Sequence, residues 1–292
     1  MGDPLDFIGE LIGTFLLVWF GCGAVAATVL FSAHSGLFQV AMIWGLGVTV
    51  AIYATRHLSC AHLNPAVSIA MVLGRRMPAA KLPAYLCGQF LGAFLAAALL
   101  YLLLADSIVQ FEIAHQIVRG SASSVRTAMI FGEFYANPGS SEVAMVSQLT
   151  ACLAEAVGSF VLVFLVFSLT EGCNLGRPGD ALAPLFIGVT VTLIISVLAP
   201  LTQAGLNPAR DLAPRVFAML AGWGRAALPD AGLGFLTVYV LSPIGGGMLA
   251  AAVFSRVVEP LMVKKSTQAC CRQKAGMAPA VSSSALLPRD GF

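Results

Sequence analysis

The stretch that decides the fold is Gly205-Leu206-Asn207-Pro208-Ala209-Arg210, which has an earlier counterpart in His62-Leu63-Asn64-Pro65-Ala66. Each stretch places an Asn-Pro pair at the start of a short apolar segment. Asparagine is a favoured N-cap residue, and proline suits the first helical position because its missing N–H would have no intrahelical partner there. Both stretches are therefore predicted to begin helices.

The composition of the chain is typical of a membrane protein. Of its 292 residues, 58% are hydrophobic and 10% are charged, whereas soluble domains carry about 25% charged residues. The formal net charge of +2 is too small to predict nucleic-acid binding. The seven cysteines lack metal-ligand spacing, and the sequence has neither a phosphate-binding glycine loop nor a nucleophile paired with a base. We therefore expect no metal, no cofactor and no enzymatic activity.

Long apolar runs predict six transmembrane helices, since about 20 apolar residues are needed to cross a bilayer. The runs are Phe7 to Leu30, Phe38 to Ala54, Leu82 to Leu104, Val146 to Leu169, Ala181 to Leu198 and Leu233 to Phe254. The segments Pro65 to Leu73 and Pro208 to Ala221 are too short to cross and are predicted to be re-entrant half-helices. Such backbone is tolerated at membrane depth where it is buried or lines an aqueous cavity. The predicted fold class is therefore an all-α membrane protein.

The two halves of the chain resemble each other. The segment from Glu10 to Val18 matches the segment from Glu155 to Val163 in its Glu-x-x-Gly-(Thr or Ser)-Phe pattern, and an Asn-Pro-Ala motif follows each at a similar distance. Because each half contributes three spans, an odd number, the second copy is predicted to be inverted in the membrane. We expect one domain over residues 1–259, with repeats at about 1–130 and 140–259.

An even number of spans places both termini on one side of the membrane. Basic residues cluster after the first half-helix, around Arg76, and in the tail, around Lys264. The positive-inside rule therefore predicts cytoplasmic termini in a multi-pass protein of the cell membrane. The tail, residues 260–292, is rich in Ser, Ala and Lys and is expected to be disordered. Within it, Cys270 and Cys271 form a candidate lipidation site.

The inverted repeat is expected to bring Asn64 and Asn207 together at the centre of the molecule. As N-caps, they turn their side-chain oxygens toward first-turn N–H groups, which leaves each NH₂ facing the cavity. The positive ends of the two half-helix dipoles disfavour cations there. Glu10 and Glu155 lie within apolar spans, and each is predicted to accept N–H groups from the loop before its own half-helix. A plain polar contact between helices is the alternative.

The backbone before each asparagine is predicted to be non-helical and to turn its carbonyl groups into the cavity, the only wet place available in a membrane. The residues concerned are Cys60, Ala61, His62, Leu63, Gln203, Gly205 and Leu206. A row of acceptors that faces apolar helices suits a small neutral solute with hydroxyl groups. Asp211 and Arg215, four residues apart on the second half-helix, are expected to form a surface pair.

These motifs resemble those of the major intrinsic proteins, or aquaporins. The paired Asn-Pro-Ala motifs, the glutamate repeat and the sequence Asn207-Pro-Ala-Arg-Asp211 carry the resemblance over nearly all of Phe7 to Phe254, and it is strongest toward the bacterial glycerol facilitators. The resemblance implies a homotetramer with one pore per subunit, which conducts glycerol and similar small neutral solutes passively, with some permeability to water. It also implies a selectivity filter formed by Trp44, Ile195, Ala204 and Arg210.

The filter departs from that of the glycerol facilitators, which have glycine at the position of Ile195 and phenylalanine at that of Ala204. Trp44 and Ile195 are still expected to form an apolar wall that faces Arg210, which favours a solute with a carbon edge. Cys60 replaces a glycine in the first pore loop, and its thiol is expected to face the cytoplasmic half of the pore.

Two more residues depart from the glycerol facilitators. Gln203 replaces a glycine in the second pore loop, and Tyr239 stands where glycerol-conducting relatives commonly have proline. The altered filter leaves water, urea, ammonia and neutral metalloid hydroxides as alternative solutes. A membrane enzyme or a non-conducting junctional protein of the same fold is a further alternative, and the intact Asn-Pro-Ala motifs and Arg210 argue against it. A secondary transporter would need a coupling carboxylate in the pore, and the sequence indicates none.

Overall fold

The structure, a computed structural model, describes residues 3–139, 145–230 and 232–274. Within these ranges the chain is helical without strands, and six helices are long and apolar enough to cross a membrane. The helices in chain order are α1 (Pro4–Phe31), α2 (Leu37–Thr55), α3 (Pro65–Leu73), α4 (Leu82–Ala114), α5 (Val125–Ala128), α6 (Gln148–Thr170), α7 (Ala183–Thr202), α8 (Pro208–Ala218), α9 (Gly234–Leu236), α10 (Ser242–Val253) and α11 (Glu259–Lys274). The sixth long helix combines α9, α10 and the start of α11, joined by π-helical turns.

Most helix bounds lie within a few residues of the predicted ones. α3 has the predicted bounds, whereas α4 continues past its predicted end at Leu104 to Ala114. The predicted disorder of the tail is wrong for its first part, because α11 is helical as far as Lys274. Residues 275–292 lie outside the described ranges, as do the side chains of Cys270 and Cys271, the candidate lipidation site.

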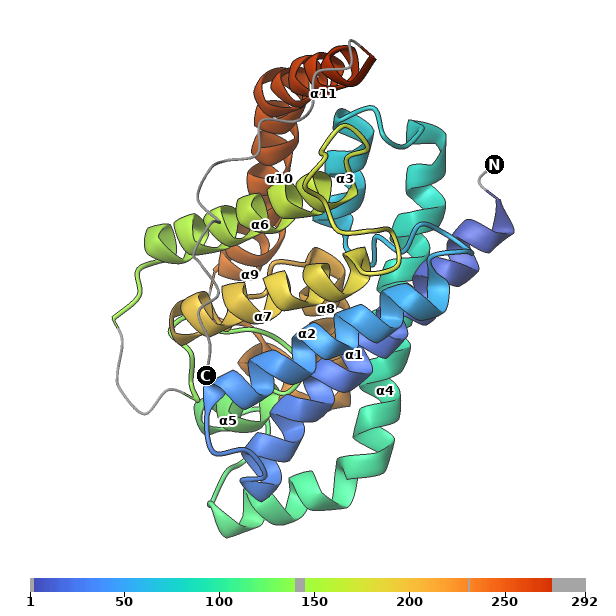
Figure 1. Cartoon of the computed structure of the whole chain (residues 1–292). Helices are drawn as coiled ribbons and strands as arrows, with labels where there is room; N and C mark the ends of the chain where they lie inside the picture. Colours follow the sequence, from blue (N-terminus) through green and yellow to red (C-terminus); the bar gives the residue numbers. More distant parts are fainter. Residues whose placement is uncertain (1–2, 140–144, 231, 275–292) are drawn as a thin grey trace, which may run out of the picture.

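The two halves of the chain are interleaved. α1 packs on α4 and α6 packs on α10, but each half-helix packs on a long helix of the other half, α3 on α10 and α8 on α4. α2 and α7 lie side by side across the middle of the molecule (Figure 1). They cross where Gly45 meets Gly188, and a Cβ atom on either glycine would collide with the carbonyl oxygen of the other. Glycine is therefore required at both positions for this close approach.

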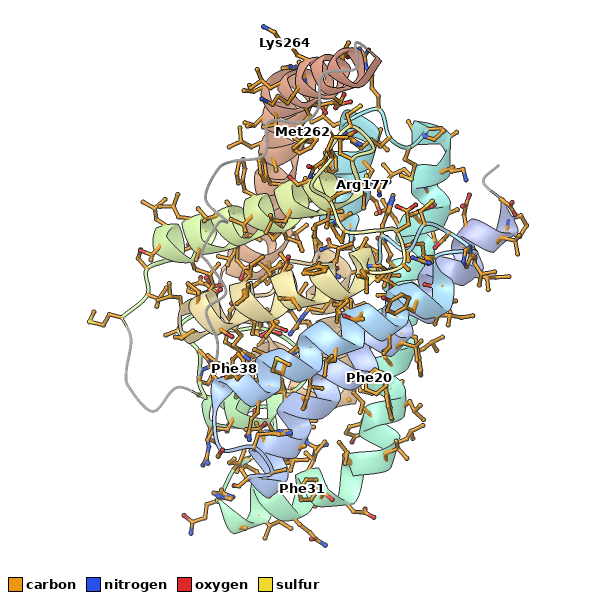
Figure 2. All side chains as sticks on the ribbon, viewed as in Figure 1. Phe20, Phe31, Phe38, Arg177, Met262 and Lys264 are labelled. Carbon is orange, nitrogen blue, oxygen red and sulfur yellow. The ribbon has the colours of Figure 1, made fainter. Side chains whose placement is uncertain are left out.

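One end of the molecule gathers the start of α1, the α3–α4 connection, the end of α6 and α11 (Figure 1). Lys81 pairs with Asp6 at 2.9 Å, and Arg76 donates to Glu171 at 2.6 Å and to Glu259 at 3.0 Å. We call this the inner end. Figure 2 shows Met262 and Lys264 at this end, and Phe31 and Phe38 at the opposite, outer end.

Candidate functional site

Asn64 and Asn207 cap the two half-helices. Asn64 Oδ1 accepts the N–H of Ala66 at 2.8 Å, and Asn207 Oδ1 accepts those of Ala209 at 3.1 Å and Arg210 at 3.2 Å. Proline follows each asparagine at the first helical position, as the Asn-Pro pattern predicts. The sequence therefore starts both half-helices at fixed residues.

The asparagine amides also tie the two halves together. Asn64 Nδ2 donates to the carbonyl oxygen of Leu206 at 3.0 Å, and Asn207 Nδ2 donates to that of Leu63 at 2.7 Å. Each NH₂ group has two hydrogens, so one remains for the cavity that both asparagines border. The two amides thus face one another across the junction of the repeats.

Glu10 anchors the loop before α3. Its Oε1 accepts from Ser59 Oγ at 2.7 Å and from the N–H of His62 at 2.9 Å, and its Oε2 accepts the N–H of Leu63 at 2.7 Å and Gln89 Nε2 at 2.6 Å. Its side chain is fully buried. Since hydrogen bonds to an ionised acceptor are the strong ones, this carboxylate holds the loop extended.

Glu155 makes the equivalent contacts in the second half. Its Oε1 accepts from Thr202 Oγ1 at 2.6 Å and from the N–H of Gly205 at 2.9 Å, and its Oε2 accepts the N–H of Leu206 at 2.7 Å. Both loops repeat the same backbone pattern, with positive φ angles at three residues each, which are Cys60, Ala61 and Leu63 in the first and Gln203, Ala204 and Leu206 in the second. Left-handed non-glycine residues cost about 1 kcal/mol or more each, so the glutamates offset a strained backbone.

Backbone N–H groups of these loops have hydrogen-bond partners within the protein, but most of the backbone carbonyl groups do not. Among the described residues, no protein donor reaches the carbonyls of Cys60, Ala61, His62, Gln203 or Gly205. The carbonyls of Leu63 and Leu206 differ from the predicted open row, because each already accepts an asparagine amide. A carbonyl oxygen has two lone pairs, so that of Leu63 retains one free acceptor site. The carbonyl oxygen of Leu206 also accepts from Ser159 Oγ at 3.5 Å.

Two cavities meet at the predicted filter. The inner cavity, of about 420 Å³, begins near Arg56 at the inner end and passes both asparagines. The outer cavity, of about 300 Å³, opens near His34 at the outer end. Trp44, Ile195 and Arg210 line both cavities. They form the constriction between the two.

Two contacts fix Arg210 at this constriction. The carbon of its guanidinium group lies 4.0 Å from the centroid of the Trp44 ring, and Nη1 forms an ion pair with Glu133 Oε1. Ile195 of α7 is buried, and Ala204 lines the inner cavity. The constriction therefore combines one cationic donor with apolar side chains.

The sequence alone assigns Glu133 no place at the filter. It lies in the segment 131–137, which folds back onto α8, and its side chain is 3% exposed. Its N–H donates to Asp211 Oδ1 at 2.8 Å, and its carbonyl oxygen accepts Arg215 Nη2 at 2.5 Å. No local sequence pattern predicts these contacts, because the partners of Glu133 are distant in the sequence.

The predicted surface pair of Asp211 and Arg215 is wrong, because both side chains are buried. They are 0% and 1% exposed and make two hydrogen bonds, at 2.5 Å and 3.1 Å. Arg215 Nη1 also donates to the carbonyl oxygen of Ala227 at 2.5 Å. The i,i+4 spacing is the same for surface pairs and buried pairs. This pair is buried because segment 131–137 folds back and covers it.

Gln203 and Tyr239 support the second pore loop from behind. Gln203 Oε1 accepts the N–H of Phe134 at 2.8 Å, and Gln203 borders the outer cavity. The Tyr239 hydroxyl donates to the carbonyl oxygen of Thr202 at 3.2 Å. A Cβ atom at Gly205 would lie 2.8 Å from Tyr239 Cδ1, too close for any other residue. Both residues thus help to hold the second pore loop in place.

Comparison with known proteins agrees with this geometry. The family described as Major intrinsic protein matches residues 5–254. The chain belongs to the major intrinsic protein family. The glycerol uptake facilitator protein of Pseudomonas aeruginosa is 42% identical over 245 residues, covering 84% of this chain and 85% of that protein.

A second relative and a solved structure support this family assignment. The propanediol uptake facilitator PduF of Citrobacter freundii is 38% identical over 261 residues, covering 88% of this chain and 94% of that protein. The X-ray structure of the aquaglyceroporin from Plasmodium falciparum superposes with a TM-score of 0.75 at 25% identity, covering 88% of this chain and 98% of that chain. The all-helical fold with six long apolar helices is that of the major intrinsic proteins.

Proposed function

We propose that the chain forms a passive pore for glycerol and similar small neutral solutes, with some permeability to water. The observation that carries the proposal is the constriction where Trp44, Ile195 and Arg210 separate two cavities. The names of the glycerol and propanediol facilitators that this chain resembles support the same solute class.

The lining is suited to such a solute because it is polar on some sides and apolar on others. Arg210, the two asparagine amides and the free carbonyls replace water around the hydroxyl groups of a polyol. Apolar side chains border the same cavity and accommodate its carbon atoms, among them Val48, Ile52, Leu162 and Val166. A cation loses its hydration and meets Arg210 and two positive helix ends, so cations are disfavoured.

We further propose that the inner end is cytoplasmic, that the protein resides in the cell membrane, and that it assembles as a homotetramer with one pore per subunit. Basic side chains at the inner end, such as Arg177 and Lys264, support the orientation by the positive-inside rule. The outward faces of the long helices carry exposed apolar residues, for example Leu102 and Val197 at 75% and 72% exposure. Such faces fit lipid or a neighbouring subunit.

Stopped-flow light scattering on proteoliposomes tests the proposal. Vesicles containing the full chain are challenged with glycerol, propanediol, urea or an impermeant sugar, and empty vesicles of the same lipid are the control. We expect glycerol and propanediol to enter several times faster than into empty vesicles, and the sugar to stay out. Glycerol entry at the rate of empty vesicles would refute the proposal. Faster entry of urea than of glycerol would show that urea is the preferred solute.

A further inference from the structure

The charge balance at the constriction raises a question about anions. Of the described charged residues that border the cavities, Arg56, Arg76 and Asp180 lie at the inner end, and Arg210 and Glu133 are the two at the constriction. Arg210 and the positive ends of α3 and α8 account for rejection of cations. By the same physics they attract small anions, so a positive constriction alone does not select neutral solutes.

Glu133 supplies the opposite charge at this place. Its Oε1 pairs with Arg210 Nη1, and its Oε2 is buried without a hydrogen-bond donor. A carboxylate that is desolvated in this way is retained only where a cation compensates it. Its side chain also approaches the second pore loop, since a Cβ atom at Gly205 would lie 3.5 Å from Glu133 Cγ.

The backbone of Glu133 is held at both of its polar groups. Asp211 accepts its N–H and Arg215 donates to its carbonyl oxygen, and these two side chains neutralise each other. The next residue, Phe134, donates its N–H to Gln203 at 2.8 Å, and Asn137 Nδ2 donates to the end of α7 at 2.9 Å. The carboxylate is thus fixed beside Arg210, as a specificity-determining group must be.

We infer that Glu133 is a specificity-determining residue whose fixed negative charge offsets that of Arg210 and makes the pore reject small anions, while the positive ends of α3 and α8 continue to disfavour cations. Arg210 keeps its remaining N–H groups for hydroxyl groups of the solute. Asp211 and Arg215 act as positioning residues through the backbone of Glu133. The inference rests on the proposed pore function.

The test measures anion and glycerol entry in parallel. Proteoliposomes of the full chain contain a fluorophore that iodide quenches, and potassium with valinomycin balances the charge that iodide carries. The variants are Glu133→Gln, which removes the charge but keeps the shape, and Glu112→Gln as the matched control. Glu112 pairs with Arg119 at 2.9 Å in a largely buried ion pair that borders neither cavity.

We expect Glu133→Gln to raise iodide entry about tenfold or more over wild type, because an uncompensated charge in a low-dielectric cleft concentrates its counter-ions. Glu112→Gln should leave iodide entry at the wild-type level. The double variant Glu133→Gln with Arg210→Gln, which has neither charge, should lose most of the added iodide entry. Iodide entry that stays at the wild-type level in a Glu133→Gln protein that conducts glycerol would overturn the inference.

A second readout decides the case in which Glu133→Gln conducts neither glycerol nor iodide. The double variant should then regain glycerol entry, since it removes the unpaired guanidinium. Failure to regain it would assign Glu133 a structural role only and overturn the inference. If wild type itself conducts no glycerol, the proposed function fails instead, and the two failures are distinguishable.

Discussion

Cys60 is the described cysteine whose chemistry bears on the pore. Its thiol is exposed and borders the inner cavity, whereas Cys87 is exposed on α4 and borders neither cavity. A mercurial on Cys60 would add bulk inside a cavity of about 420 Å³. We predict that mercurials slow glycerol entry into proteoliposomes, that Cys60→Ser removes most of this effect, and that Cys87→Ser does not. Equal inhibition of the Cys60→Ser protein would contradict the placement of this thiol.

The filter residues Ile195 and Ala204 provide a second prediction. Replacing them by Ile195→Gly with Ala204→Phe exchanges the aliphatic side chain of α7 for an aromatic one beside Trp44. An aromatic corner packs against the carbon backbone of a polyol while Arg210 binds its hydroxyl groups. We expect a higher ratio of glycerol to water permeability, measured by stopped flow on the same vesicles. Loss of glycerol entry in a folded double variant would show that the assigned filter positions are wrong.

The third prediction concerns Glu155 and the thermal stability of the protein. In Glu155→Gln, an NH₂ group replaces one carboxylate oxygen and faces the N–H donors of Gly205 and Leu206. Losing a hydrogen bond to a charged group costs about 2 kcal/mol. Thermal unfolding in detergent, followed by circular dichroism, should show a clear decrease in melting temperature. Asp106→Asn, at an exposed position of α4, is the control and should melt like wild type. An unchanged melting temperature of Glu155→Gln would contradict the anchoring role.

The residues that the sequence predicts are those with a local or repeated pattern. Asn64 and Asn207 have their prolines beside them, and Glu10 and Glu155 are found because the pattern around them occurs twice. Glu133 has no such pattern, since its contacts depend on how a connecting segment folds back. Long-range docking of this kind cannot be read from spacing.

At the scale of elements, the half-helices are the most predictable and the connections are the least. α3 begins and ends as predicted because its N-cap and the length of its apolar segment depend only on neighbouring residues. α4 is longer than its apolar run, and the burial of Ile108 and Glu112 in its last turns shows that packing against the outer connection extends it. α11 is helical although its composition favours disorder, since it continues the sixth long helix.

The inner end offers a prediction on pH. Burial raises the pKa of the Glu171 carboxyl, but hydrogen bonds from Arg76 and from the N–H of Cys173 outweigh it and hold the pKa below its ordinary value of 4.5. The charged carboxylate therefore stabilises the fold above pH 4.5, and this contribution is lost as the pH falls through the lowered pKa.

The measurement is thermal melting of wild type and Glu171→Gln over a range of pH. At neutral pH the variant should be less stable by about 1 kcal/mol, the scale of a partly exposed ion pair. In strongly acidic buffer the two proteins should melt together. A difference that persists or grows in acid would contradict the sign of the pKa shift.

At the scale of the whole molecule, the inverted repeat explains both the fold and the position of the site. Two copies in opposite orientation bring the half-helix starts face to face, and the close crossing of α2 and α7 at Gly45 and Gly188 brings the halves together. The repeat predicts that the half-helix starts meet, whereas the glycine crossing of α2 and α7 is seen only in the structure. The balance of charge at the constriction requires the structure, because it joins α8 to a segment outside the repeated pattern.

The central claim is that solute crosses the molecule between Trp44, Ile195 and Arg210. Ile195→Trp fills this constriction, whereas Val197→Trp adds the same side chain on the same helix at a position that is 72% exposed. Glycerol entry into proteoliposomes is measured by stopped flow for both variants, after thermal melting has shown that both are folded. Entry should fall to the rate of empty vesicles for Ile195→Trp and remain at the wild-type rate for Val197→Trp. Wild-type glycerol entry through the Ile195→Trp protein would contradict the claim.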